Sequence, residues 1–169
     1  YNFSPALRVG AGGGIGTPEA ALAAFNMGAA YIVLGSVNQA CVEAGASEYT
    51  RKLLSTVEMA DVTMAPAADM FEMGVKLQVL KRGSMFAMRA KKLYDLYVAY
   101  DSIEDIPADE HEKIEKQIFR SNLDEIWAGT IAFFTERDPE MLERAMSSPK
   151  RKMALIFRWY LGLSSRWSN

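Results

Sequence analysis

Two short stretches near the start of the chain combine glycines with hydroxyl side chains in an order that suits phosphate binding. They are Arg8 to Glu19, which contains a glycine cluster, and Gly35-Ser36. Glycines let backbone N–H groups approach an anion closely, and a helix N-terminus adds donors and a partial positive charge. Thr17 is a suitable N-cap and Pro18 a suitable first helical residue. The pattern predicts a phosphate cradle, and a tight turn without a ligand would use similar residues.

A strand–helix–strand unit is predicted to position both stretches. Residues 7–11 are typical of a short buried strand, residues 17–27 of a helix that ends at Gly28, and residues 29–34 of a parallel strand covered on both faces. Because the C-terminal ends of parallel strands lie at one edge, where ligands bind in open sheets and barrels, both glycine stretches are expected there.

Two parallel strands do not form a stable sheet, since each needs neighbours and helices on both faces. We therefore expect further strands to precede Tyr1 or to belong to another piece. Apolar groups around residues 7–11 would lack cover in this chain alone, so self-association, as in a homo-oligomer, or partial disorder is expected there.

The remainder of the chain is predicted to be mainly helical. Residues 38–73 indicate an interrupted helical region, and residues 75–80 alternate like a half-exposed strand, although a helix also fits six residues. The other predicted helices cover residues 38–44, 47–57, 84–100, 108–119 and 123–136, with two more that start at residues 139 and 149. The predicted organisation is a βα region over residues 1–57 and a helical region over residues 58–169.

The composition excludes several classes of protein. The 169 residues include 19 basic and 21 acidic side chains, a balance that gives no electrostatic case for nucleic-acid binding. A single cysteine excludes an internal disulfide framework and fits a reducing compartment. No apolar run reaches the roughly 20 residues that cross a bilayer, and the N-terminus has no signal-peptide pattern. A soluble, cytoplasmic protein is expected.

Several motifs resemble known flavoproteins. Gly13-Gly14-Ile15, Gly28-Ala29-Ala30 and the strand that ends in Gly35-Ser36 resemble the last two βα units of FMN-dependent (β/α)8 TIM barrels, closest to the nitronate monooxygenase and flavin enoyl-reductase group. The stretches that sharpen the match are 35–45, 58–62, 64–75 and 157–167. They are similar to the PfaD-type trans-acting enoyl reductases of polyunsaturated fatty-acid synthases and some polyketide synthases, and the resemblance covers essentially the whole chain.

The resemblance implies an α/β fold, with the end of a TIM barrel in residues 1–57 and a helical substrate or lid region in residues 58–169. It implies an FMN enzyme that takes hydride from NADPH and delivers it to the β-carbon of an enoyl thioester on an acyl carrier protein. By similarity, Gly13, Gly14, Gly35 and Ser36 would hold the FMN phosphate, with Ile15 packed beside it.

The sequence departs from the full family pattern in one large respect. The family histidine near the flavin comes from an earlier barrel strand, in a Gly-Gly-His type segment that this sequence lacks. No catalytic residue is therefore assigned in this chain, no metal site is expected, and the chain alone should be inactive.

Two other functions fit the same motifs. A nitronate monooxygenase would use the same FMN cradle without a carrier protein. A non-catalytic helical docking module of a megasynthase would bind a carrier or another synthase component without flavin. The visible absorption spectrum and a comparison of enoyl-thioester reduction with nitroalkane oxidation separate the three.

Remaining candidate groups have structural as well as functional interpretations. His111 lies on a charged helix, where a solvated structural role is favoured over catalysis. Cys41 lies near the predicted cofactor edge, where the role of a small buried residue is favoured over that of a redox thiol. Asp61, Asp69 and Glu72 lack a His or Cys partner, so surface or capping roles are favoured over a metal. Six methionines, with Phe71 and Phe86, either line a channel for an acyl chain or pack in a core; they are Met59, Met64, Met70, Met73, Met85 and Met88.

A locally basic segment covers residues 76–92. Its cationic residues are Lys76, Lys81, Arg82, Arg89, Lys91 and Lys92. Carrier proteins are acidic, so this segment is either a docking surface or an ordinary solvated face. Reversing the charges of Lys81, Arg82 and Lys92 should weaken carrier binding in a salt-sensitive way if it docks.

Overall fold

The computed structural model describes residue 4 and residues 6–164. It divides between Val57 and Glu58 into two compact units, which are described separately below. Residues 165–167, which end the C-terminal stretch of the resemblance, lie outside the described residues.

The first unit is a strand–helix–strand arrangement, as predicted. Strand β1 (Ala11–Gly12) pairs in parallel with β2 (Ile32–Val33), and helix α1 (Pro18–Asn26) connects them. Local signals explain the bounds of α1, because the Thr17 hydroxyl accepts a hydrogen bond from the Ala20 N–H at 3.2 Å. Two short helices follow, α2 (Ser36–Gln39) and α3 (Glu48–Leu54), so the helix predicted over residues 38–44 is shorter and starts earlier.

The prediction of fully buried strands in this unit is wrong for the described structure. Leu7 and Val9 are 71% and 74% exposed and precede β1, and Val33 in β2 is 61% exposed. Ala24 is the single buried apolar residue among the described residues up to Val57. The physical reason is that α1 is the only long helix here, while a parallel strand needs a covering layer on each face.

The second unit begins with a β-hairpin. Strand β3 (Val62–Pro66) pairs antiparallel with β4 (Lys76–Leu80), and the short helices η1 (Met59–Asp61) and η2 (Phe71–Met73) precede β3 and lie between the strands. The strand predicted over residues 75–80 is confirmed. The helical interpretation of residues 38–73 is wrong at β3, because pairing with β4 decides its conformation and Pro66 is tolerated at a strand end.

Five helices and one π-helical turn in the described residues complete the second unit. They are α4 (Phe86–Ala99), α5 (Ala108–Ile114), the π-helix η3 (Glu115–Phe119), α6 (Leu123–Arg137), α7 (Pro139–Met146) and α8 (Pro149–Ser164). Asn122 and Asp138 cap α6 and α7, as predicted, by accepting hydrogen bonds from the N–H groups of Glu125 and Met141. The single helix predicted over residues 108–119 changes to a π-helix at Glu115, whose carboxylate accepts from the Leu123 N–H at 2.7 Å.

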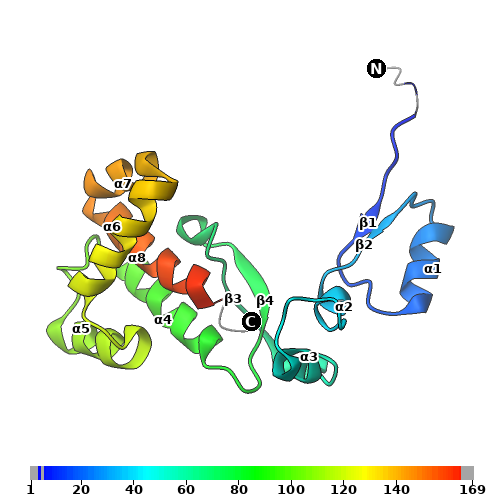
Figure 1. Ribbon diagram of the computed structural model, residues 1–169, viewed down its shortest axis with the longest axis horizontal. Helices are drawn as coiled ribbons and strands as arrows, with labels where there is room; N and C mark the ends of the chain where they lie inside the picture. The colour runs from blue at the N-terminus through cyan, green and yellow to red at the C-terminus, as the bar shows by residue number, and fades with distance from the viewer. Residues whose placement is uncertain (1–3, 5, 165–169) are drawn as a thin grey trace. The chain divides into compact units, whose positions relative to one another are not determined.

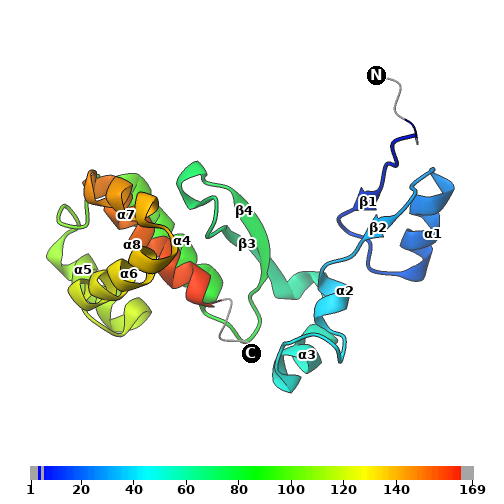
Figure 2. The ribbon, with the colours of Figure 1, turned by 45° about the horizontal axis from the view of Figure 1, so that its top comes forward.

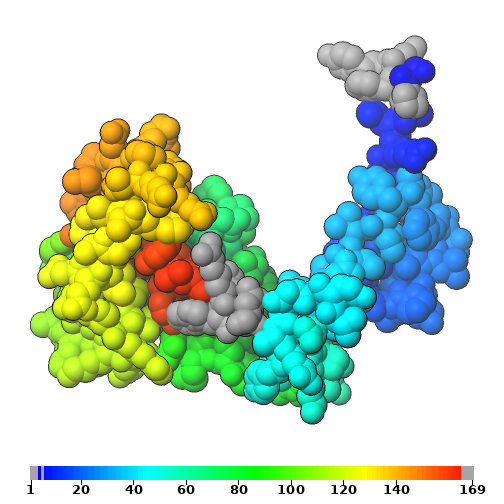
Figure 3. Space-filling view, in the orientation of Figure 1, coloured from blue at the N-terminus to red at the C-terminus, as the bar shows by residue number. Residues whose placement is uncertain are grey.

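Helix α8 lies at the centre of this unit (Figures 1 and 2). It packs against α4, α6, α7 and η2, and Figure 3 shows it, in red, between α6 in yellow and α4 in green. The largest fully buried side chains are Phe71, Leu93, Ile114, Thr130, Met153, Ile156 and Phe157. The second unit therefore has a continuous core of its own, drawn from the hairpin and the helices.

None of the helices in the described part of the chain has both the length and the apolar character needed to cross a membrane.

Candidate functional site

The two glycine stretches meet at one edge of the first unit. Gly12 pairs with Val33, so the chain leaves β1 at Gly13-Gly14 beside the point where β2 leads to Gly35-Ser36. Gly13 and Gly14 have φ values of +87° and +70°, a conformation that glycine adopts without penalty. A Cβ added to Gly13, Gly14 or Gly35 would meet no atom within 4 Å, so the space beside this edge is open.

Backbone donors lie at this edge. Within residues 6–164, the amides of Gly13 and Gly14 donate none of the turn and loop hydrogen bonds, which are counted apart from the β1–β2 ladder. The N-terminus of α1 follows after the half-buried Ile15, and the exposed Ser36 opens α2. Backbone N–H groups, positive φ and open space are the features that phosphate binding requires, so these residues fit such a group.

A mainly apolar pocket lies in the helical unit. It has a volume of about 290 Å³ and is lined mainly by apolar side chains, among them Phe133, Phe134, Leu155 and Trp159. Phe133 and Trp159 are in ring contact, with centroids 4.4 Å apart. The lining suits an aliphatic ligand rather than a highly charged one.

The methionines singled out in the sequence do not form a core. All six are 38–80% exposed, so they take no part in the core formed by the described residues; they are Met59, Met64, Met70, Met73, Met85 and Met88. Of their two companions, Phe71 is fully buried and Phe86 half-buried. The channel hypothesis for these methionines stays a prediction.

The basic segment of residues 76–92 is partly neutralised. Arg82 lies 3.2 Å from Asp61, Lys91 pairs with Asp95, and Lys92 pairs with Glu110. Lys76 and Lys81 have no ion pair among the residues that the structure describes. Reversing the charge of Lys92 would break its ion pair with Glu110. Charge reversal at Lys76 and Lys81 therefore gives a cleaner test of docking.

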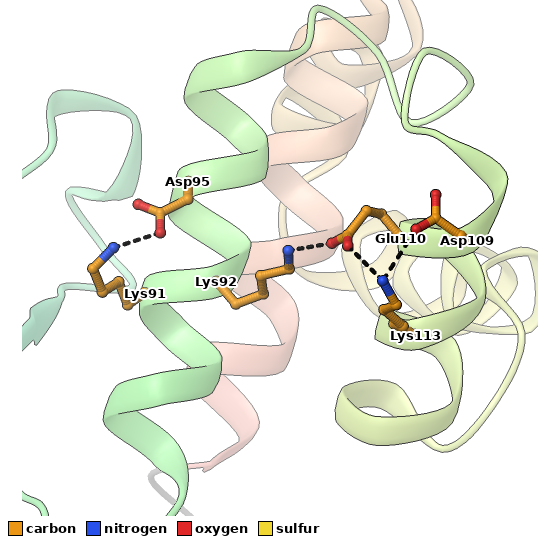
Figure 4. Close-up of polar contacts among 6 residues, drawn as sticks. All are labelled: Lys91, Lys92, Asp95, Asp109, Glu110 and Lys113. Carbon is orange, nitrogen blue, oxygen red and sulfur yellow. Dashed lines mark hydrogen bonds and ion pairs between the residues drawn. The ribbon is translucent and has the colours of Figure 1, made fainter.

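Glu110 joins α4 to α5 (Figure 4). Lys92 reaches it from α4, and Lys113 lies 2.8 Å from it on α5. Hydrogen bonds from Lys113 and Lys92 lower the pKa of the Glu110 carboxyl to about 2 from its usual 4.5. This cluster serves packing between helices rather than ligand binding.

The other titratable candidates also have local partners. His111 is half-buried, with its Nδ1 atom 3.7 Å from the Glu115 carboxylate. The Cys41 thiol is half-buried and donates to the Val37 carbonyl at 3.5 Å. Over the described ranges no group of three His, Cys, Asp or Glu side chains is arranged to hold a metal ion.

Arg158 is a structural residue that the sequence does not single out by itself. Its Nε donates to the Ala68 carbonyl at 3.0 Å, Nη2 donates to the Asp69 carbonyl at 3.4 Å, and Nη1 lies 3.2 Å from the Glu72 carboxylate. Arg158 therefore fastens α8 to the segment before β4. It joins the two most specific motifs of the sequence, residues 64–75 and 157–167.

Comparisons with known proteins relate the chain to synthases. Residues 100–169 match the family model of the helical domain inserted in [acyl-carrier-protein] S-malonyltransferase. One of the polyunsaturated fatty acid synthase subunits of Thraustochytrium sp. is 55% identical over 100% of this chain and 11% of that protein. Polyketide biosynthesis protein PksE of Bacillus subtilis is 46% identical over 98% of this chain and 21% of that protein.

A solved structure extends the comparison to the fold. The enoyl reductase domain of MlnA, from the macrolactin biosynthesis cluster of Bacillus amyloliquefaciens, superposes with a TM-score of 0.86 and 40% identity. The match covers 96% of this chain and 36% of that one. This chain shares the fold of part of an enoyl reductase domain. The predicted class, an α/β region followed by a mainly helical one, is thereby confirmed.

Proposed function

We propose that this chain is part of an FMN-dependent enoyl reductase, of the PfaD type, that acts in polyunsaturated fatty-acid or polyketide biosynthesis. The observation that carries the proposal is the TM-score of 0.86 with an enoyl reductase domain over 96% of the chain. The names of the synthase relatives support the pathway class. Because the chain spans only 11% and 21% of those two relatives, we assign the activity to the longer protein that contains this chain.

In this proposal the glycine edge binds the FMN phosphate. The N–H groups of Gly13 and Gly14 donate to the phosphate oxygens, and Gly35 and Ser36 contact the phosphate after the neighbouring strand, with Ile15 beside the site. FMN, when bound, supplies the hydride-transfer chemistry, with NADPH as the hydride donor. The exposed apolar residues of the first unit support the proposal that further strands of a TIM barrel pack against this unit.

The proposed substrate is an enoyl thioester held on an acyl carrier protein. Two observations support a carrier partner: the match of residues 100–169 to a helical domain of a carrier-protein transferase, and the unpaired Lys76 and Lys81 among the described residues. A carrier is acidic, so these lysines would attract it through long-range electrostatics.

The test uses the protein that carries this chain, purified without added flavin. We expect a visible flavin spectrum and NADPH-dependent reduction of an enoyl thioester. Nitroalkane oxidation without enoyl reduction would identify a nitronate monooxygenase, and a colourless protein that binds carrier would identify a docking module. Either result contradicts the proposal.

A glycine substitution links the activity to this edge. Gly14→Val places a branched side chain at φ +70°, which strains the turn and blocks the approach of a phosphate. We expect flavin content to fall at least about tenfold. The matched control is Gly129→Ala, at an exposed position in α6 where a Cβ meets no atom within 4 Å. Equal flavin loss in both variants would show that the edge does not bind FMN.

A further inference from the structure

A pocket of about 380 Å³ lies between α4, η3, α6 and α8 in the helical unit. The residues of its lining that matter here are Arg89, Phe119, Arg120, Ile126, Trp159 and Tyr160. Ligand pockets for small organic molecules commonly have volumes of about 300–1,000 Å³ and mainly apolar walls with a few polar groups. The pocket has this size and this lining.

The charge of the pocket lining is positive. Its lining contains two guanidinium groups and no carboxylate. Arg89 donates to the Tyr160 hydroxyl at 3.4 Å, and within residues 6–164 neither Arg89 nor Arg120 forms an ion pair. Two cations beside an apolar wall repel each other and favour an anion between them.

The backbone at Arg120 is unusual in the same place. Arg120 has φ +56° and is the one non-glycine residue with positive φ in the described part of the chain. It directly follows the π-helix η3, and π-helical turns and left-handed non-glycine residues concentrate at functional sites. The Glu115 carboxylate, which accepts from the Leu123 N–H, holds this turn. The turn brings Phe119 and Arg120 to the pocket together.

We propose that this pocket binds a phosphate ester whose organic body packs against the aromatic wall. The guanidinium fork matches phosphate oxygens, and Phe119, Trp159 and Tyr160 offer ring surfaces for the rest of the ligand. The choice of phosphate rests on the proposed function, because both reactants of that reaction carry phosphate esters. One source is the 2′-phosphate of the nicotinamide nucleotide, and the other is the phosphopantetheine arm of the carrier.

The test measures binding by titration calorimetry on the protein that carries this chain. The probes are adenosine 2′,5′-bisphosphate and 4′-phosphopantetheine, each compared with its unphosphorylated counterpart, adenosine or pantetheine. We expect one phosphorylated probe to bind at least about tenfold more tightly than its counterpart, since charge-assisted hydrogen bonds carry the affinity. Binding should weaken as salt is raised. The probe that binds identifies the source.

Two pocket variants and one control assign the binding to the arginines. Arg120→Gly removes the guanidinium and suits the backbone, because glycine adopts φ +56° without strain, so this variant stays folded. Arg89→Gln removes the second charge. The control is Arg144→Gln, an exposed arginine of α7 that pairs with Glu140 outside the pocket. We expect about a tenfold or greater loss of affinity in both pocket variants and none in the control.

The outcomes separate this inference from the proposed function. Equal binding of phosphorylated and unphosphorylated probes, or unchanged binding in both pocket variants, overturns the inference. A flavin-containing, active reductase that binds neither probe also overturns it and leaves the proposed function intact. A flavin-free protein that binds a probe through Arg89 and Arg120 supports the inference and refutes the proposed function.

Discussion

Replacing Arg158 with alanine is expected to lower the free energy of unfolding by about 2.5 kcal/mol. Arg158 makes three contacts with the segment between β3 and β4, and two of them are hydrogen bonds to the backbone carbonyls of Ala68 and Asp69. Its loss would remove all three of these contacts between α8 and the segment.

The magnitude follows from the three contacts. The 3.0 Å bond from Nε to the Ala68 carbonyl is a hydrogen bond from a charged donor and contributes about 1.5 kcal/mol. The 3.4 Å contact with the Asp69 carbonyl is longer and weaker, at about 0.5 kcal/mol. The Glu72 side chain is 42% exposed, so solvent screening limits that ion pair to about 0.5 kcal/mol.

Urea-induced unfolding followed by far-UV circular dichroism measures the effect. A loss of about 2.5 kcal/mol corresponds to a fall in Tm of roughly 5–10 °C for a chain of this size. Glu72→Gln is the matched control, because it removes only the screened ion pair and should cost about 0.5 kcal/mol. Arg158→Lys keeps the charge but not the planar fork, so it should fall between the two.

The reasoning would be refuted by either of two results. One is an Arg158→Ala variant whose unfolding free energy stays within about 0.5 kcal/mol of the parent chain, since that would make the carbonyl contacts negligible. The other is a Glu72→Gln variant that costs as much as Arg158→Ala, since that would assign the stabilisation to the exposed ion pair.

Three further predictions concern the helical unit. Phe157→Ala removes a fully buried ring 6.2 Å from Phe119 and should cost about 3–5 kcal/mol in urea unfolding, with Phe157→Leu costing clearly less; equal costs would contradict tight packing there. Because the pKa of Glu110 is lowered to about 2 from 4.5, its stabilisation is complete above pH 4.5 and is lost as pH falls towards 2. The stability difference between the parent and Glu110→Gln should therefore shrink below pH 4.5, and a difference independent of pH would contradict this assignment. Lys150 donates to the carbonyls of Tyr97 and Tyr100 at the end of α4, so Lys150→Met should lower stability by about 1–2 kcal/mol, and an unchanged Tm would refute this.

Elements with local signals were predictable from the sequence. Thr17, Asn122 and Asp138 start their helices because a capping side chain bonds to an N–H group only two or three residues away. The alternation of apolar residue types at 75, 77 and 79 indicated β4, since alternate side chains of a strand share a face. Burial in β4 does not alternate, because Lys76 to Gln78 are exposed and Val79 and Leu80 are half-buried.

Elements that depend on distant partners were not predictable in the same way. Strand β3 forms because it pairs with β4, whose residues lie 10 to 18 positions further along the chain. The helical pattern seen in residues 38–73 carries no information about that pairing. The three partners of Arg158 lie 86–90 residues away in the sequence. Sequence spacing gives no indication of such a contact.

The glycine edge combines both kinds of information. The sequence alone predicted a strand, a turn and the start of a helix here, because the glycines, Thr17 and Pro18 act on their immediate neighbours. Only the tertiary structure placed Gly13-Gly14 beside Gly35-Ser36 and left open space there, since parallel pairing of β1 with β2 sets that distance. The positive pocket at Arg89 and Arg120 was likewise decided by helix packing, because its walls come from four elements that no local pattern brings together.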